Sequence, residues 1–186
     1  MALADRNSFD RAARSVDYRN AERYRFRGRF LFDGIGLAGA RVLEVGSGAG
    51  AWALWAALHG ACRVLAIEPE AEGSHGHALD RLERNIEKMG FENVIEARGC
   101  RLQDLPLSAE RFDVAIMYNV INHLDEDSVV RLHRDPSAEE RYLALLRLLR
   151  MHLAARGVVI VADCGRNNLW PRLGLTSPHH FIYRKS

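Results

Sequence analysis

The residues best suited to chemistry are three alternating glycines, Gly46, Gly48 and Gly50, with Glu44 two positions before the first. A short apolar run with β-branched residues leads into them, and an apolar helical pattern follows over 51–58. This order predicts a buried strand, a glycine-rich turn and a helix N-terminus. Glycine permits a positive φ and close approach of a ligand, and the helix N-terminus presents unpaired N–H groups. The turn therefore suits an anionic or carboxylate-bearing cofactor.

A second carboxylate, Glu68, ends the next apolar run, 63–67, and is followed by Pro69. The two apolar runs with the intervening helix predict two parallel strands in a βαβ unit. A carboxylate about 20 residues beyond a glycine turn can accept hydrogen bonds from both hydroxyls of a ribose. The turn and Glu68 together indicate a nucleoside cofactor more strongly than either does alone, the alternative for Glu68 being a solvated acid at a strand end.

The glycine spacing distinguishes between nucleoside cofactors. A dinucleotide site has the pattern G-x-G-x-x-G, whereas this chain has E-x-G-x-G-x-G. That arrangement resembles motif I of the class I S-adenosylmethionine-dependent methyltransferases, although any glycine turn between a strand and a helix remains an alternative. The resemblance implies that Glu68, with Pro69 beside it, binds the ribose. It also implies that the methionine end of the cofactor is held by Glu44, Gly46, Ser47, Gly48 and Gly50.

The adenine contact departs from the family pattern. In that family an acid often follows the third strand and receives the adenine amino group, and the matching place here is Arg101. Arginine has no hydrogen-bond acceptor. We therefore expect either that Gln103 or Asp104 substitutes, or that backbone groups near Cys100 and Leu102 bind the adenine.

The acceptor side is predicted from the fourth apolar run, 112–117, which continues into Tyr118 and Asn119. The stretch resembles the family motif F-D-V-x-x-x-x-V-x-x-H-L. Ligands of open α/β sheets lie beyond the carboxyl ends of the strands, so we expect Tyr118 and Asn119 to face cofactor and substrate. His123 is a candidate general base because the ordinary pKa of histidine is near neutral; a structural histidine at a helix start is the alternative.

Residues 8–37 are rich in arginine and aromatic residues, and the acids Asp10, Asp17 and Glu22 interleave with the arginines. This mixture favours an amphipathic helical lid with solvated arginines over a nucleic-acid-binding arm. The resemblance implies that such a segment closes over cofactor and substrate. Tyr18 is therefore a candidate catalytic residue, and Tyr24 is a weaker site candidate.

Composition limits the remaining possibilities. The 186 residues, 48% of them hydrophobic, are enough for one domain with a buried core. No run reaches membrane-spanning length, and the N-terminus lacks the apolar core of a signal peptide. The three cysteines show no metal-ligand spacing, so we expect buried or free thiols in a reducing cytoplasm and no metal site. A net charge of only +2 gives no reason to expect nucleic-acid binding from the charge of the whole chain.

Together these elements predict an α/β Rossmann-like fold, a three-layer sandwich around a mostly parallel sheet with strand order 3-2-1-4-5. We expect the helical lid over 1–37, the cofactor-binding domain over 38–165 and a short tail over 166–186. Compared with the seven-stranded sheet of the family, the final hairpin of strands six and seven is reduced or missing. The predicted strands cover 41–45, 63–67, 93–97, 112–117 and 158–163, and the predicted helices cover 51–58, 71–90, 125–133 and 137–155.

A fifth strand without further neighbours is an exposed hydrophobic edge, and such an edge can pair with another chain. Either Phe181–Tyr183 folds back as a substitute edge strand, or a second copy of the chain covers the edge in a homodimer.

The sequence thus predicts an S-adenosylmethionine-dependent methyltransferase that acts on a small-molecule acceptor by O- or N-methylation. One alternative is a catalytically inactive, truncated methyltransferase-like binding protein, which the arginine at position 101 and the short C-terminus keep open. The other is an NAD-dependent oxidoreductase on the same fold, against which the glycine spacing argues.

Overall fold

The structure, a computed structural model, describes five segments of the chain. The predicted tail over 166–186, with the strand suggested at Phe181–Tyr183, lies outside them, and so does the start of the helix predicted over 71–90. The described residues are 6–16, 18, 20–70, 76–107 and 110–163.

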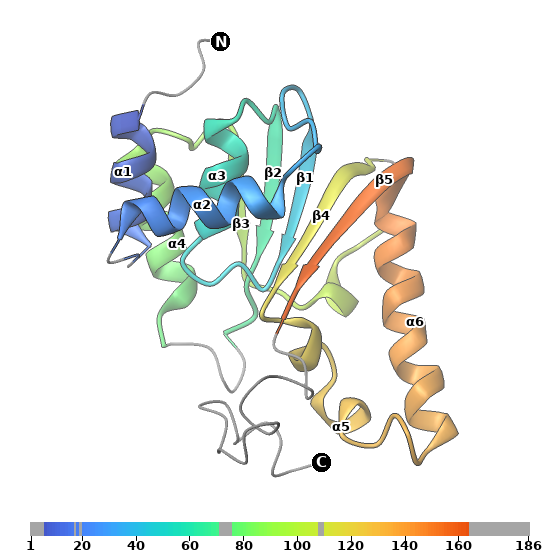
Figure 1. Ribbon diagram of the computed structural model, residues 1–186. Coiled ribbons are helices and arrows are strands. Elements are labelled where there is room, and N and C mark those ends of the chain that lie inside the picture. The colour runs from blue at the N-terminus through green and yellow to red at the C-terminus, as the bar shows by residue number, and fades with distance from the viewer. Residues whose placement is uncertain (1–5, 17, 19, 71–75, 108–109, 164–186) are drawn as a thin grey trace.

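Five strands form one sheet in the order β3-β2-β1-β4-β5, and every pairing between them is parallel (Figure 1). In register, Val45 lies beside both Ile67 and Met117, so the carboxyl ends of the three central strands meet at one edge. The predicted fold class and strand order are confirmed. The strands are β1 (Arg41–Val45), β2 (Arg63–Ile67), β3 (Ile95–Arg98), β4 (Phe112–Tyr118) and β5 (Leu153–Ala162).

Helices cover both faces of the sheet, as a three-layer sandwich requires. The first four helices lie on one face, and α6 lies on the other with the short segments that precede it (Figure 1). The helices are α1 (Arg6–Ser15), α2 (Ala21–Leu31), α3 (Ala51–Leu58), α4 (Ala78–Met89), α5 (Glu126–Val129) and α6 (Pro136–His152), with 3-10 turns η1 (Leu102–Asp104) and η2 (Ile121–His123).

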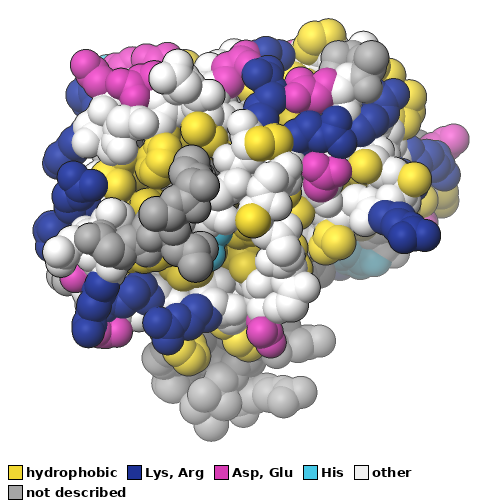
Figure 2. All heavy atoms as spheres, turned by 90° about the horizontal axis from the view of Figure 1, so that it is seen from above, with side chains coloured by type: hydrophobic (Ala, Val, Ile, Leu, Met, Phe, Trp, Pro, Cys, Tyr) yellow, Lys and Arg dark blue, Asp and Glu magenta, His cyan; other side chains and the backbone are white. Residues whose placement is uncertain are grey.

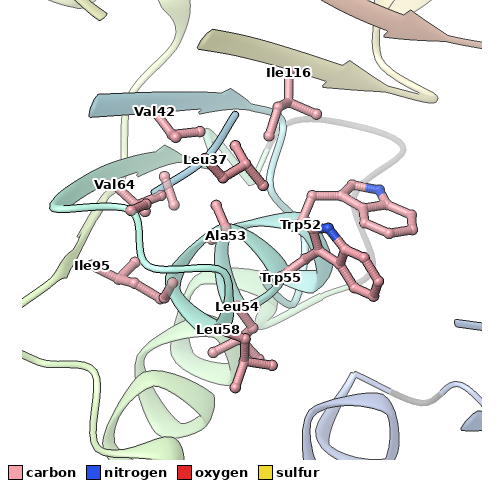
Figure 3. Close-up of a cluster of buried hydrophobic side chains, with 14 of the residues drawn as sticks. Leu37, Val42, Trp52, Ala53, Leu54, Trp55, Leu58, Val64, Ile95 and Ile116 are labelled. Carbon is pink, nitrogen blue, oxygen red and sulfur yellow. The ribbon is translucent and has the colours of Figure 1, made fainter. Parts of the chain in front are cut away.

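Helix α3, which follows the glycine turn, is buried along almost its whole length. Seven of its eight residues are buried, and Ala53 points from the helix toward Val42 and Val64 of the sheet (Figure 3). Trp52 and Trp55 lie at 6.4 Å between ring centroids. Burying each large apolar side chain contributes about 1.5–3 kcal/mol, so this packing fixes the position of the helix and of the turn before it.

The N-terminal helices share this core. The Gly28 backbone of α2 lies so close to the Trp55 ring that a Cβ on Gly28 would be 2.4 Å from it. Tyr24 is fully buried, stacks on Trp52 at 5.7 Å and donates a hydrogen bond of 2.7 Å from its hydroxyl to the Ala51 carbonyl. Tyr24 therefore lies in the core and not at a site surface.

The boundary between α6 and β5 differs from the prediction. The helix expected to run to Ala155 ends at His152, and β5 begins at Leu153. Leu153 pairs with Phe112, while Val158 pairs with Val114, so the residues between them bulge out of the ladder. Leu153 is thus a strand residue and not part of the helix face, because pairing with β4 overrides the helical preference of the neighbouring leucines and alanines.

Opposite charges alternate at the amino ends of the strands. Arg41 forms an ion pair with Asp113 at 3.1 Å, and Arg63 pairs with Glu96 at 2.8 Å and with Glu110 at 3.0 Å. Seen from this end, Lys/Arg and Asp/Glu side chains lie interspersed (Figure 2). The arginines of these pairs are therefore balanced by carboxylates.

The outer edge of β5 and the lengths of the helices bear on binding to other proteins and to membranes. Among the described residues, β5 pairs with β4 alone, and Val158, Val159 and Val161 are 42%, 40% and 46% exposed. In the same part of the chain, no helix combines the length and the apolar character needed to span a bilayer.

Candidate cofactor and acceptor site

The glycine turn between β1 and α3 is held by the end of β2. The N–H groups of Gly46 and Ser47 donate to the Ile67 carbonyl at 2.9 and 3.0 Å, and the Ser47 hydroxyl donates to the same oxygen at 3.3 Å. This anchoring positions the turn at the carboxyl edge of the sheet, where ligands of α/β folds bind.

The three glycines of the turn serve two purposes. All have positive φ, 68° at Gly46, 52° at Gly48 and 86° at Gly50. A Cβ on Gly46 would be 2.3 Å from Val120, and one on Gly50 would be 2.4 Å from Leu82. A Cβ on Gly48 would have no atom of the described residues within 4 Å. Packing thus requires glycine at Gly46 and Gly50, whereas the Gly48 backbone borders open space that a ligand can enter.

Glu44 lies under the turn and binds the start of α3. Its carboxylate accepts hydrogen bonds from the N–H of Trp52 at 3.3 Å and of Ala53 at 2.8 Å, two of the unpaired donors of a helix N-terminus. The side chain is 2% exposed. Burial, with a smaller contribution from the nearby Glu68, outweighs the lowering effect of the two N–H groups and raises the pKa of Glu44 to about 8.

Glu68 follows β2, as predicted, and turns toward the glycine turn. One carboxylate oxygen accepts from the Gly48 N–H at 2.7 Å and the other from the Glu70 N–H at 3.1 Å. The residue is 4% exposed, and Pro69 beside it is half-buried. The second acid of the predicted site is therefore hydrogen-bonded to Gly48, the glycine of this turn that borders open space.

On the adenine side, Arg101 is exposed and immediately precedes η1, in which Leu102 is 2% exposed. The Gln103 side-chain amide donates to the Leu124 carbonyl at 3.2 Å. This bond directs the Gln103 amide toward the segment after β4. Asp104 is exposed.

Asn119 comes directly after β4 and has φ of 55°, a conformation that few non-glycine residues adopt. Its N–H donates to the Ala162 carbonyl at 2.7 Å, which fixes the conformation, and its side chain is exposed. Because β4 lies beside β1, Asn119 belongs to the same edge of the sheet as the glycine turn.

His123 ends η2, and its Nδ1 lies 2.7 Å from a carboxylate oxygen of Glu126. The imidazole is 36% exposed. A carboxylate that hydrogen-bonds one ring nitrogen selects the tautomer and leaves the other nitrogen to act as a base. The pair has the geometry of an oriented histidine, which general-base chemistry requires.

Tyr18 lies over the core between the N-terminal helices and β4. Its ring is 5.1 Å from Tyr24 and 6.3 Å from Trp52. Its hydroxyl accepts a hydrogen bond of 3.4 Å from Arg27, and Arg27 also donates to the Tyr118 hydroxyl at 3.0 Å. The structure therefore joins Tyr18 to the end of β4 through an arginine that sequence reasoning did not single out.

Asn85 is a second residue that sequence reasoning missed. It lies in α4, is 8% exposed, and its amide donates to the Ala49 carbonyl of the turn at 2.9 Å. A polar residue between Leu82 and Ile86, both buried, was the available signal, because a buried amide needs a hydrogen-bond partner.

Comparison with known proteins agrees with this geometry. A family model described as a methyltransferase domain matches residues 42–135, just over half of the chain. The chain belongs to this methyltransferase family. The predicted resemblance to class I methyltransferases is confirmed, and the match includes the glycine turn, Glu68 and His123. No curated protein sequence matches the chain significantly.

Solved structures show the same fold at low sequence identity. The chain is similar to a structure described as a DhpI-SAM-HEP complex, with a TM-score of 0.56, 18% identity and coverage of 93% of this chain and 70% of that one. It is also similar to a methyltransferase from Thiobacillus denitrificans in complex with S-adenosyl-L-homocysteine. The TM-score is 0.52 and the identity 20%, with coverage of 83% of this chain and 53% of that one. YjhP from Escherichia coli has a TM-score of 0.52 and 17% identity, with coverage of 84% of this chain and 56% of that one. The chain thus spans little more than half the length of the latter two proteins.

Proposed function

We propose that this protein transfers a methyl group from S-adenosylmethionine to a small-molecule acceptor, by O- or N-methylation. The observation that carries the proposal is the turn at Gly48, whose backbone borders open space and whose N–H binds the carboxylate of Glu68. Membership of the methyltransferase family supports it, as do the neighbours of the same fold described with S-adenosylmethionine or S-adenosylhomocysteine.

The residues present fit this cofactor. The open space at Gly48 allows close approach to the main chain, and Glu68 supplies a carboxylate for ribose hydroxyls. Pro69 would border the ribose, while the exposed Arg101 and the backbone of Leu102 would border the adenine. The methionine end would be held by Glu44, Gly46, Ser47, Gly48 and Gly50. The bound cofactor supplies an electrophilic methyl group on a sulfonium.

The remaining work of the protein is alignment and proton removal. Asn119 is exposed beside the turn and orients the acceptor at the rim, and Tyr18 borders the acceptor from the N-terminal helices, which act as a lid. His123, oriented by Glu126, accepts the proton of a hydroxyl or ammonium acceptor. Alignment of two reactants alone can lower a barrier by several kcal/mol.

Calorimetric titration of the purified chain with S-adenosylmethionine, S-adenosylhomocysteine and NADH tests the proposal. We expect micromolar binding of the first two ligands and none of NADH. Binding of NADH alone would establish the oxidoreductase instead. If the folded protein binds neither S-adenosylmethionine nor S-adenosylhomocysteine, the proposal is wrong.

An inactive binding protein is the second candidate, and the exposed arginine at position 101 in place of the usual acid favours it. Assays of radiolabel transfer from S-adenosylmethionine to a panel of small-molecule acceptors distinguish the active methyltransferase from the inactive binding protein. Methylated product that is lost in His123→Ala supports the enzyme. Tight cofactor binding without product from any acceptor supports the binding protein.

We also propose a homodimer in which a second copy covers the edge of β5. The proposal is supported by the three half-exposed valines of this strand and by its single neighbour, β4, among the described strands. An exposed apolar edge of this kind is a template for pairing with an identical strand.

A further inference from the structure

Arg27 lies in α2 and reaches over the carboxyl end of β4. Its Nη1 donates to the hydroxyls of Tyr118 at 3.0 Å and Tyr18 at 3.4 Å, and its guanidinium carbon is 5.8 Å from the centroid of the Tyr18 ring. All three side chains are half-buried. One cation is thus held in place by two neutral phenols at a surface that small molecules can reach.

A comparison with Arg25, two residues earlier in the same helix, shows what is unusual about Arg27. Arg25 is 7% exposed and forms ion pairs with Asp10 and Glu22. Within the described segments, Arg27 forms no ion pair with a carboxylate. A phenol hydroxyl does not neutralise a guanidinium, and a partly buried charge without a counter-ion is costly. The Arg27 site therefore favours an anion supplied from outside.

The position of Arg27 relative to the glycine turn gives that anion a role. Met117 lies beside Val45 in the sheet, so Tyr118 follows at the level of Gly46. The Tyr118 ring is 5.1 Å from Trp52, the second residue of the helix that the turn begins. Arg27, which donates to the Tyr118 hydroxyl, therefore lies near the carboxyl end of β4. The exposed Asn119 follows this strand end, where the proposed acceptor would bind.

We propose that Arg27, together with Tyr18 and Tyr118, binds an anionic oxygen group on the methyl acceptor, a carboxylate or a phosphate-type group. Guanidinium is the cation best matched to these groups, because its N–H donors fit two oxygens at once. The Tyr18 hydroxyl accepts from Arg27 and keeps its own proton to donate to the anion. The assignment as an acceptor subsite rests on the proposed methyltransferase function and narrows its substrate class.

The experiment titrates the full chain, saturated with S-adenosylhomocysteine, with inorganic phosphate and separately with acetate in a low-chloride buffer. Because bound S-adenosylhomocysteine occupies the glycine turn, any anion that still binds must bind at another site. We expect at least one of the two anions to bind, with about tenfold weaker binding in Arg27→Met. Arg23→Met, an exposed arginine of the same helix, is the matched control and should bind like wild type. The anion that binds better identifies the class of acceptor.

Other outcomes separate this inference from the proposed function. If S-adenosylhomocysteine binds but neither anion does, or if Arg27→Met binds the anions as wild type does, the subsite is wrong and the methyltransferase proposal stands. If S-adenosylhomocysteine does not bind, the same anion titration without it still decides the subsite. Tyr18→Phe, which removes only a hydroxyl, should weaken anion binding several-fold and keeps the test decisive should Arg27→Met fail to fold.

Discussion

The carboxylate of Glu68 accepts a hydrogen bond of 2.7 Å from the backbone N–H of Gly48. Glu68 follows β2 and Gly48 lies in the turn after β1, so the bond joins two neighbouring strand ends at the carboxyl edge of the sheet. The same carboxylate is the proposed ribose ligand. If Glu68 binds the ribose, turn geometry and cofactor affinity are coupled through this one side chain.

Glu68→Ala should weaken binding of S-adenosylhomocysteine by about 10–100-fold, because it removes hydrogen bonds to a charged group worth roughly 1.5–3 kcal/mol. Isothermal titration measures the change. Glu87→Ala, an exposed acid of α4, is the control and should leave the affinity unchanged.

A ligand without ribose hydroxyls separates the two roles of Glu68. If the carboxylate binds the ribose, Glu68→Ala should cost much less affinity for a 2′,3′-dideoxyribose analogue than for S-adenosylhomocysteine. Equal losses with both ligands would mean that Glu68 acts only by holding the turn at Gly48.

Alanine substitutions should separate the glycines of the turn by function. In Gly50→Ala the new Cβ would be 2.4 Å from Leu82, so we expect a loss of stability of about 2 kcal/mol or more. In Gly48→Ala the Cβ meets no atom of the described segments within 4 Å. The left-handed backbone then opposes the substitution by about 1–2 kcal/mol.

Cofactor binding should show the opposite order between these two variants. The Cβ of Gly48→Ala projects into the space proposed for the cofactor, so the folded variant should lose most of its affinity for S-adenosylhomocysteine. Urea denaturation and calorimetry measure the two quantities. Full affinity in a well-folded Gly48→Ala protein would rule out close approach of the cofactor at this glycine.

Local signals explain why so much of this fold could be predicted. The apolar runs of the strands and the glycines that interrupt them lie within short stretches of sequence, and parallel strands with intervening helices permit few topologies. The glycine turn is such a local signal. Its packing partners, Val120 and Leu82, come from distant stretches, so sequence spacing alone could not divide the glycines into packing and binding positions.

The features that sequence reasoning missed all depend on tertiary contacts. Arg27 looks like any other arginine of an amphipathic helix until Tyr18 and Tyr118 are placed beside it. Asn85 becomes informative only when Ala49 lies next to it. The end of α6 was misplaced because Leu149 and Leu153 fit a helical spacing equally well, and pairing of Leu153 with Phe112 decides the boundary.

The buried Glu44 should make stability fall as the pH rises from about 5 to 8. Its pKa is about 8 in the folded protein against an ordinary value of 4.5, so between these values the native state binds more protons than the unfolded state. The free energy of unfolding then decreases with pH, by an amount on the order of a few kcal/mol over the whole window.

Glu44→Gln isolates this contribution because it cannot ionise, while every other titrating group is retained. Urea denaturation of both proteins at pH 5, 6, 7 and 8 should show wild type losing stability relative to the variant as the pH rises. Parallel pH dependences would show that Glu44 is ionised throughout, with the N–H groups of Trp52 and Ala53 outweighing burial.

Charges placed on β5 should convert the proposed dimer into a monomer. Val159 and Val161 lie on the same face of the strand and are 40% and 46% exposed. We expect wild type to have twice the monomer mass by light scattering, and the double variant Val159→Lys/Val161→Lys to have the monomer mass, because lysines on an edge strand oppose pairing. Phe30→Lys, a change at a 76% exposed residue of α2, should remain dimeric.

Cofactor affinity should be the same in all three proteins, since the glycine turn lies at β1 and not at this edge. A wild-type protein that is monomeric at every concentration would eliminate the dimer, and a double variant that stays dimeric would move the interface away from β5.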